Sequence, residues 1–104
     1  MKTVGDYTLF GYFEGAPYDY VTDTLADFEH LQNDLPRQVI IDHIQDLTPA
    51  ISSARGKDAY SGDVYQAAQY DDGHFVFPID VLRYLKQGKI GVPKEYEEYI
   101  TRTV

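Results

Sequence analysis

The chain of 104 residues contains no cysteine and no tryptophan. The absence of cysteine excludes disulfide scaffolds, thiol catalysis and zinc sites built from thiolates. No apolar run approaches the roughly 20 residues that a membrane-spanning helix needs. The first residues, Met1 to Asp6, contain no apolar segment of the kind found in secretory signals. We therefore expect a cytoplasmic protein that makes no contact with a membrane.

Basic residues are also scarce. The chain has 9 Lys and Arg against 17 Asp and Glu, which gives a net charge of −8 and a pI of about 4.6. Nucleic acids and anionic membranes are bound mainly by Lys and Arg, so this charge argues against direct binding to either. The remaining composition, with 43% hydrophobic residues, is that of an ordinary globular protein. Length and composition together predict a single domain over residues 1–104.

Motifs of known catalytic or metal chemistry are missing from the sequence. It contains no HExxH, GxSxG, P-loop or dinucleotide-binding pattern. Residues 71–73 (DDG) lack the alternating acids of a calcium loop and are typical of a turn. His43 falls within the apolar stripe of a predicted helix, so we interpret it as a histidine of the core or its edge. We predict no enzyme, no catalytic residues, no metal site and no cofactor.

The spacing of hydrophobic and turn-forming residues predicts an α+β fold with about four helices and a small antiparallel sheet. The aromatic run at 7–13 predicts a strand, and the polar stretch at 52–62 predicts a loop. A hairpin is expected near 64–77, with its turn at 71–73. Helices are expected at 22–33, 34–47, 78–85 and from 93 to 100, with Thr22, Asp34, Pro78 and Pro93 at or near their starts.

Negative charge is concentrated in the first half of the chain. Residues 1–54 carry nine acidic and two basic residues, which is a net charge of −7. Residues 55–104 carry eight acidic and seven basic residues, which is a net charge of −1. Any strongly negative surface must therefore be built mainly from the first half.

Two pairs of aspartates place negative charges close together within this half of the chain. Asp23 and Asp27 are four residues apart, as are Asp42 and Asp46, so each pair is expected on one face of its predicted helix. Like charges at this spacing oppose folding by about 0.2–0.5 kcal/mol per pair. Each face is either a solvated helix surface or a negative surface that steers a basic partner.

Tyrosine is abundant, with ten in the chain. Tyr18 and Tyr20 flank Asp19 directly before the first predicted helix. Tyrosine combines a large contact area with a polar tip and is enriched at the cores of protein interfaces, although most of these tyrosines could instead build a small core. The sequence predicts a partner-binding surface formed by Tyr18, Asp19, Tyr20, Asp23, Asp27, Asp42 and Asp46.

Two segments of the last third, DDGHFVFP at 71–78 and IGVPKEYEEYI at 90–100, resemble small bacterial immunity proteins. The class that they are most similar to is the immunity proteins of contact-dependent growth inhibition systems. This resemblance implies a cytoplasmic protein that binds and blocks a toxin domain, often a nuclease, and it transfers no residue roles. Nuclease toxins tend to be basic because their substrate is a polyanion, so an acidic inhibitor is the expected counterpart.

Four functions remain open from the sequence. The first is an immunity protein that neutralises a basic toxin domain, such as a nuclease, by occluding its active or substrate-binding site. The second is a phage-type nucleic-acid mimic that inhibits a restriction or CRISPR effector, although the nearly neutral second half disfavours a mimic charged along its whole length. The third is a small ligand-binding or enzymatic domain, which would need a deep pocket that holds a histidine with a perturbed pKa. The fourth is a structural or regulatory subunit.

Overall fold

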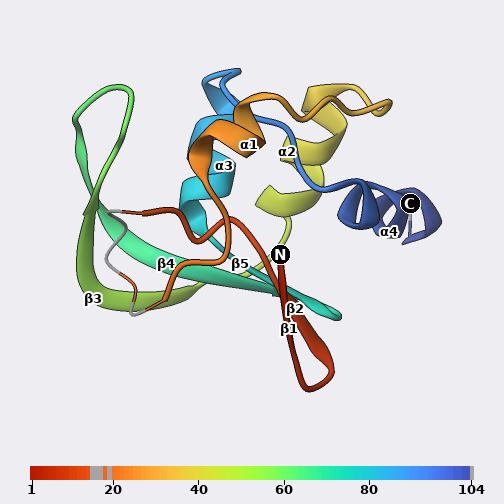
Figure 1. Cartoon of the computed structure of the whole chain (residues 1–104), viewed down its shortest axis with the longest axis horizontal. Coiled ribbons are helices and arrows are strands. Elements are labelled where there is room, and N and C mark those ends of the chain that lie inside the picture. The colour runs from red at the N-terminus through yellow and green to blue at the C-terminus, as the bar shows by residue number, and fades with distance from the viewer. Residues whose placement is uncertain (15–17, 19, 104) are drawn as a thin grey trace.

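The computed structural model of the chain describes residues 1–14, 18 and 20–103. Within them, five strands form one mixed, mostly antiparallel sheet in the order β1-β2-β5-β4-β3, and four helices gather on one side of it (Figure 1). The predicted α+β class is therefore confirmed. The elements are β1 (Lys2–Val4), β2 (Tyr7–Leu9), α1 (Leu25–Glu29), α2 (Arg37–Gln45), β3 (Ala50–Lys57), β4 (Val64–Asp72), β5 (Phe75–Pro78), α3 (Ile79–Lys86) and α4 (Lys94–Thr103).

The sheet has two strands more than the sequence predicted. The expected hairpin near 64–77 is present as β4 and β5, and β2 joins β5 as the one parallel pair of the described sheet. The first additional strand is β1, which forms an antiparallel hairpin with β2. The second is β3, so the prediction of a loop at 52–62 was wrong over most of its length. Its polar sequence suits an edge strand, because only one of its edges is paired and most of its side chains meet water.

The ladder between β3 and β4 is interrupted. Ile51 lies opposite Ala68 and Arg55 lies opposite Gln66, so the three residues 52–54 face the single residue Ala67. This is a bulge on the edge strand, and such bulges bend a strand and increase its twist. In Figure 1 the β3–β4 hairpin rises beside the sheet toward the helices.

The first predicted strand and helix are both shorter than expected. The strand ends at Leu9, although the amide of Phe10 still donates to the Val76 carbonyl at 3.2 Å. The predicted helix at 22–33 contracts to α1, because the amide of Thr22 donates to the carbonyl of Tyr12 at 2.9 Å. This bond holds the chain extended just before α1, so Thr24 and not Thr22 caps the helix.

The remaining helices agree better with the predictions. α3 and α4 begin directly after Pro78 and Pro93, where a proline ring fits the first turn of a helix. α2 begins after Pro36, three residues past Asp34, which had been the expected start. The chain before α2 is held instead by α4, because the amide of Leu35 donates to the buried carboxylate of Glu97 at 2.7 Å. None of the helices in the described part of the chain is long and apolar enough to cross a membrane.

The core is built around aromatic rings between the helices and the sheet. The ring of Phe10 lies 4.8 Å from that of Phe77, 5.2 Å from that of Tyr96 and 6.3 Å from that of Phe28, centroid to centroid. These residues come from the segment after β2, from β5, from α4 and from α1, and all are nearly or fully buried. Packing of this kind supplies most of the stability of short helices, which are marginal alone.

Gly11 follows Phe10 at a point where only glycine fits. Its φ is +81°, and a Cβ at this position would overlap Cγ2 of Val81 on α3. We expect Gly11→Ala to lower the free energy of unfolding by about 3 kcal/mol, because the strain of a positive φ adds to overpacking. Gly5→Ala is the matched control, since Gly5 has φ +58° but nothing within 4 Å of an added Cβ, and it should cost about 1 kcal/mol. Urea unfolding of both variants measures the difference, and equal losses would show that the Val81 contact is unimportant.

Candidate functional site

The predicted tyrosines pack together against β4. The ring of Tyr12 lies 5.2 Å from that of Tyr18 and 4.6 Å from that of Tyr20. The hydroxyl of Tyr18 donates to the carbonyl of Ala68 at 3.0 Å and that of Tyr20 donates to Gln69 at 3.2 Å. Tyr18 is half-buried and its hydroxyl is hydrogen-bonded within the protein, whereas Tyr20 is 39% exposed. Tyr20 therefore remains available as a surface contact, and Asp19 lies outside the described residues.

The predicted aspartate pair at 23 and 27 does not share a helix. Asp23 precedes α1, and its carboxylate accepts hydrogen bonds from the amide of Gly11 at 2.9 Å and the hydroxyl of Thr22 at 2.8 Å. It also forms an ion pair with the amino group of Met1. Asp23 is therefore a structural residue, and the expectation that it presents a free charge beside Asp27 was wrong.

Asp27, Asp42 and Asp46 are exposed. Asp27 lies on α1, while Asp42 lies on α2 and Asp46 caps its C-terminal end, so all three belong to the helical side of the sheet (Figure 1). No ion pair in the described part of the chain involves any of them, since the three recorded pairs join Asp23 to Met1, Asp72 to His43 and Asp58 to Arg83. A carboxylate at the C-terminal end of a helix, as at Asp46, opposes the helix dipole.

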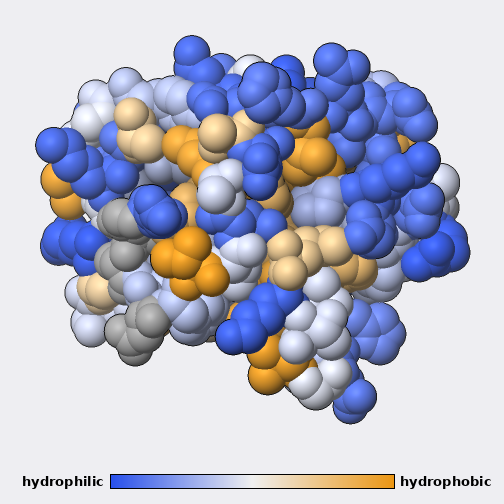
Figure 2. All heavy atoms as spheres, in the orientation of Figure 1, coloured by the Kyte–Doolittle hydropathy of each residue, from blue (hydrophilic) through white to orange (hydrophobic). Residues whose placement is uncertain are grey.

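The surface around these residues is mostly hydrophilic. On the face shown in Figure 2, hydrophobic residues form separate small areas among charged and polar ones. Asp23 and Asp27 line one shallow hollow of about 280 Å³ together with Phe28, Leu31 and Glu95. The two aspartates of α2 do not line it, so the predicted residues divide into a part near α1 and a part on α2.

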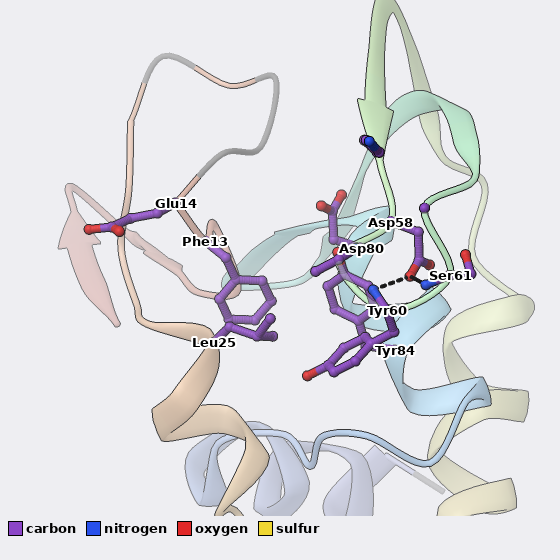
Figure 3. Close-up of a pocket in the computed structure, with 11 residues that line it drawn as sticks. Phe13, Glu14, Leu25, Asp58, Tyr60, Ser61, Asp80 and Tyr84 are labelled. Carbon is purple, nitrogen blue, oxygen red and sulfur yellow. Dashed lines mark hydrogen bonds between the residues drawn. The ribbon is translucent and has the colours of Figure 1, made fainter.

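A larger pocket of about 530 Å³ lies elsewhere, between the segment before α1 and the loop that joins β3 to β4. Phe13, Glu14 and Leu25 form one wall, and Asp58, Tyr60, Asp80 and Tyr84 are among the residues of the other (Figure 3). None of these residues belongs to the surface predicted from the sequence.

Asp58 holds the β3–β4 loop. It is 2% exposed, and its Oδ1 accepts from the amides of Tyr60 at 2.8 Å and Ser61 at 2.9 Å, as the dashed lines in Figure 3 show. Its Oδ2 accepts from Gln87 at 2.7 Å and pairs with the Arg83 guanidinium at 3.1 Å. Burial acts to raise the pKa of Asp58, but these four donors outweigh it and lower the pKa to about 2.

Asp80 is the second buried carboxylate of the pocket. It is 2% exposed, and its Oδ2 accepts from the hydroxyl of Tyr65 at 2.5 Å. Its Oδ1 accepts only a long bond, at 3.4 Å, from the hydroxyl of Tyr18. Burial raises the pKa of Asp80, and the hydrogen bonds and the charge of nearby Arg83 offset this only in part. The ionised form of Asp80 is therefore held at a cost in stability, without a cation in contact among the described residues.

A third polar cluster joins α2, β4 and α4 away from the pocket. The carboxylate of Asp72 lies 2.7 Å from Nε2 of His43 and accepts from the hydroxyl of Tyr96 at 2.7 Å. His43 is half-buried, so its interpretation as a histidine at the edge of the core is confirmed. The described residues contain no group of three His, Asp or Glu side chains placed to hold a metal ion.

Comparison of the chain with protein-family models, with curated proteins and with solved structures found no match.

The two buried aspartates of the pocket should respond oppositely to replacement by asparagine. At pH 7 Asp58→Asn should lower the free energy of unfolding by about 2 kcal/mol, because the charge-assisted bonds from Arg83 and Gln87 are lost. The pKa of Asp58 is 3.8 in the unfolded chain and about 2 in the folded protein, so its ionised carboxylate stabilises the fold at any pH above 3.8. This stabilisation disappears as the pH falls through about 2. The loss in Asp58→Asn should therefore disappear over the same range.

Asp80→Asn should instead raise the free energy of unfolding at pH 7. A raised pKa means that folding becomes less favourable as the pH rises above 3.8, because Asp80 then ionises more readily in the unfolded chain than when it is buried. Asparagine can still accept the hydrogen bond from Tyr65 but carries no charge, so the gain should shrink toward pH 3. Urea unfolding at several pH values tests both variants, and a destabilised Asp80→Asn at pH 7 would contradict the assignment of Asp80.

Proposed function

We propose that this protein is an immunity protein that binds a basic toxin domain, such as a nuclease, and blocks its active or substrate-binding site. The observation that carries the proposal is the set of exposed carboxylates at Asp27, Asp42 and Asp46, none of which has a cationic partner in the described part of the chain. These three charges form part of the net charge of −8. Exposed carboxylates without cationic partners attract a basic partner and repel acidic ones.

The position of the charges adds to this argument. Asp46 caps the C-terminal end of α2, where a cation and not an anion would stabilise the helix. Tyr20 and Val21, which are 39% and 52% exposed, precede Thr24, the N-terminal cap of α1, the helix that carries Asp27. An exposed aromatic ring beside charged groups is the usual composition of an interface that is desolvated on binding.

The chemistry of the proposed partner follows from the same features. A toxin that cleaves nucleic acid must bind phosphates, and it does so with Lys and Arg. Carboxylates of the inhibitor would take the place of those phosphates, and one inhibitor molecule would block one toxin molecule without turnover. The affinity should depend on salt, because exposed charges are screened over about 8 Å at physiological ionic strength.

Charge reversal tests the proposal. We expect the variant with Asp27→Lys, Asp42→Lys and Asp46→Lys to bind the partner at least about tenfold more weakly than the wild type. The matched control reverses three exposed acids outside the helices, Asp6, Asp63 and Asp71, and changes the net charge equally. Asp23 is left intact because its reversal would disrupt the bonds to Gly11 and Thr22.

The partner is first retained from host lysate on the immobilised wild type, identified by mass spectrometry and produced separately. Its dissociation constant is then measured for all three proteins at rising salt, and its nuclease activity is measured with increasing inhibitor. Loss of affinity in the helix variant alone, together with inhibition at one-to-one stoichiometry, would support the proposal. Equal affinity of the helix variant and the wild type, or a bound partner that stays active, would overturn it.

A further inference from the structure

The pocket beside the β3–β4 loop carries a second, separate inference. It is lined by the aromatic residues Phe13, Tyr60 and Tyr84 and by the acidic residues Glu14, Asp58 and Asp80, of which Glu14 points its carboxylate away from the pocket (Figure 3). We propose that this pocket binds an organic cation, meaning an alkylammonium or guanidinium group, with the aromatic rings against its apolar surface and Asp80 against its charge. This inference does not depend on the proposed function, because none of the three aspartates of the helical surface lines the pocket.

The arrangement of the rings is the first argument. Tyr60 and Tyr84 meet nearly at a right angle, with an interplanar angle of 85° and centroids 5.1 Å apart. Phe13 follows Tyr84 with centroids 6.1 Å apart. Tyr60 and Tyr84 thus pack edge to face, and the electron-rich faces of aromatic rings that remain open attract an organic cation.

The two buried carboxylates of the pocket differ in their bonding partners. Asp58 is engaged by Arg83 and by the amides of its own loop, so it shapes the pocket and does not bind a ligand. Asp80 is 2% exposed and lines the pocket, and its carboxylate accepts from two tyrosine hydroxyls, one of them at 3.4 Å. It takes part in none of the ion pairs recorded among the described residues. A buried carboxylate is unfavourable without a cation, and a cationic ligand would supply the partner that it lacks.

Cationic side chains of the protein itself already pack against aromatic rings around this pocket. The guanidinium of Arg83 lies 4.3 Å above the ring of Tyr65, whose hydroxyl is bonded to Asp80. The ammonium of Lys89, which does not line the pocket, lies 5.4 Å from the centroid of Tyr60. Among the residues that the structure describes, the one cationic side chain lining the pocket is that of Lys57, which is exposed and follows the bulged part of β3. It is the competitor that an incoming cation would have to displace.

The site is tested on the full-length protein by NMR titration at constant ionic strength. Tetramethylammonium and methylguanidinium are the probes, and tert-butanol is the neutral control of similar shape to the first. We expect saturable shifts at the amides of residues 58–62 with a dissociation constant of about 1 mM or tighter for the cations, and no saturation with tert-butanol. Saturation with tert-butanol at equal concentration, or no saturation with either cation, would overturn the inference.

Four variants assign the binding to the pocket. Asp80→Asn keeps the acceptor for Tyr65 and should weaken cation binding about tenfold, as should Tyr60→Leu, which removes one aromatic ring of the pocket. Lys57→Met should strengthen binding because the competing ammonium is gone. Asp63→Asn is the control, since Asp63 is exposed on the same loop but does not line the pocket. Wild-type affinity in both Asp80→Asn and Tyr60→Leu would overturn the assignment.

The cation can be a free small molecule or the side chain of a protein. A blocked glycine peptide with one arginine separates these sources, with the same peptide carrying citrulline as its neutral control. Tighter binding of the arginine peptide than of methylguanidinium would identify a protein side chain as the ligand. Tighter binding of the free cation would identify a small molecule. A citrulline peptide that binds as well as the arginine peptide would contradict a cation site of either kind.

Discussion

The packing of Phe10 joins parts of the chain that are far apart in the sequence. Its ring contacts the rings of Phe28, Phe77 and Tyr96, which belong to α1, β5 and α4. α1 has only 5 residues and α4 only 10, and helices of that length do not persist alone in water. Their positions therefore depend on this aromatic contact, and with them the position of the helical surface that carries Asp27. Gly11 permits the arrangement, because the chain must turn sharply directly after Phe10 while passing close to α3.

The parts of the fold that sequence patterns predicted are those determined by local preferences. α3 and α4 begin directly after proline residues and keep an apolar stripe. The expected hairpin of β4 and β5 is present, but its turn lies at Gly73 and His74 and not at 71–73, because Asp71 and Asp72 pair with β5 as part of β4. The parts of the fold that were predicted wrongly depend on hydrogen bonds between segments far apart in the sequence. Thr22 has the composition of a helix cap, but the carbonyl of Tyr12 binds its amide and keeps it extended. β3 has the composition of a loop, and only its pairing with β4 makes it a strand.

The residues of the candidate sites also divide into those that the sequence predicts and those that depend on contacts between distant segments. Exposed acids such as Asp27, Asp42 and Asp46 could be predicted, because charged residues on a helix face remain in water unless something pairs with them. Asp23 could not be predicted as a structural residue, since its partners Gly11 and Thr22 reach it only through the return of the chain past Tyr12. The pocket was missed because Asp58 lay in an expected loop and Asp80 has the common placement of an acid in the first turn of a helix. Asp58 and Asp80 differ from the other acids of the sites by being buried, and no motif in the sequence around them indicates this burial.

The bulge at residues 52–54 has a consequence for the protein in concentrated solution. β3 forms one edge of the sheet, and an unpaired edge is a template onto which the strand of another molecule can add. Here three residues stand opposite one, so the outward row of amides and carbonyls is broken in the middle of the strand. Arg55 and Lys57 add positive charge to the same edge. An incoming strand would find only short stretches in register, which makes β3 a poor starting point for growth of the sheet into fibres.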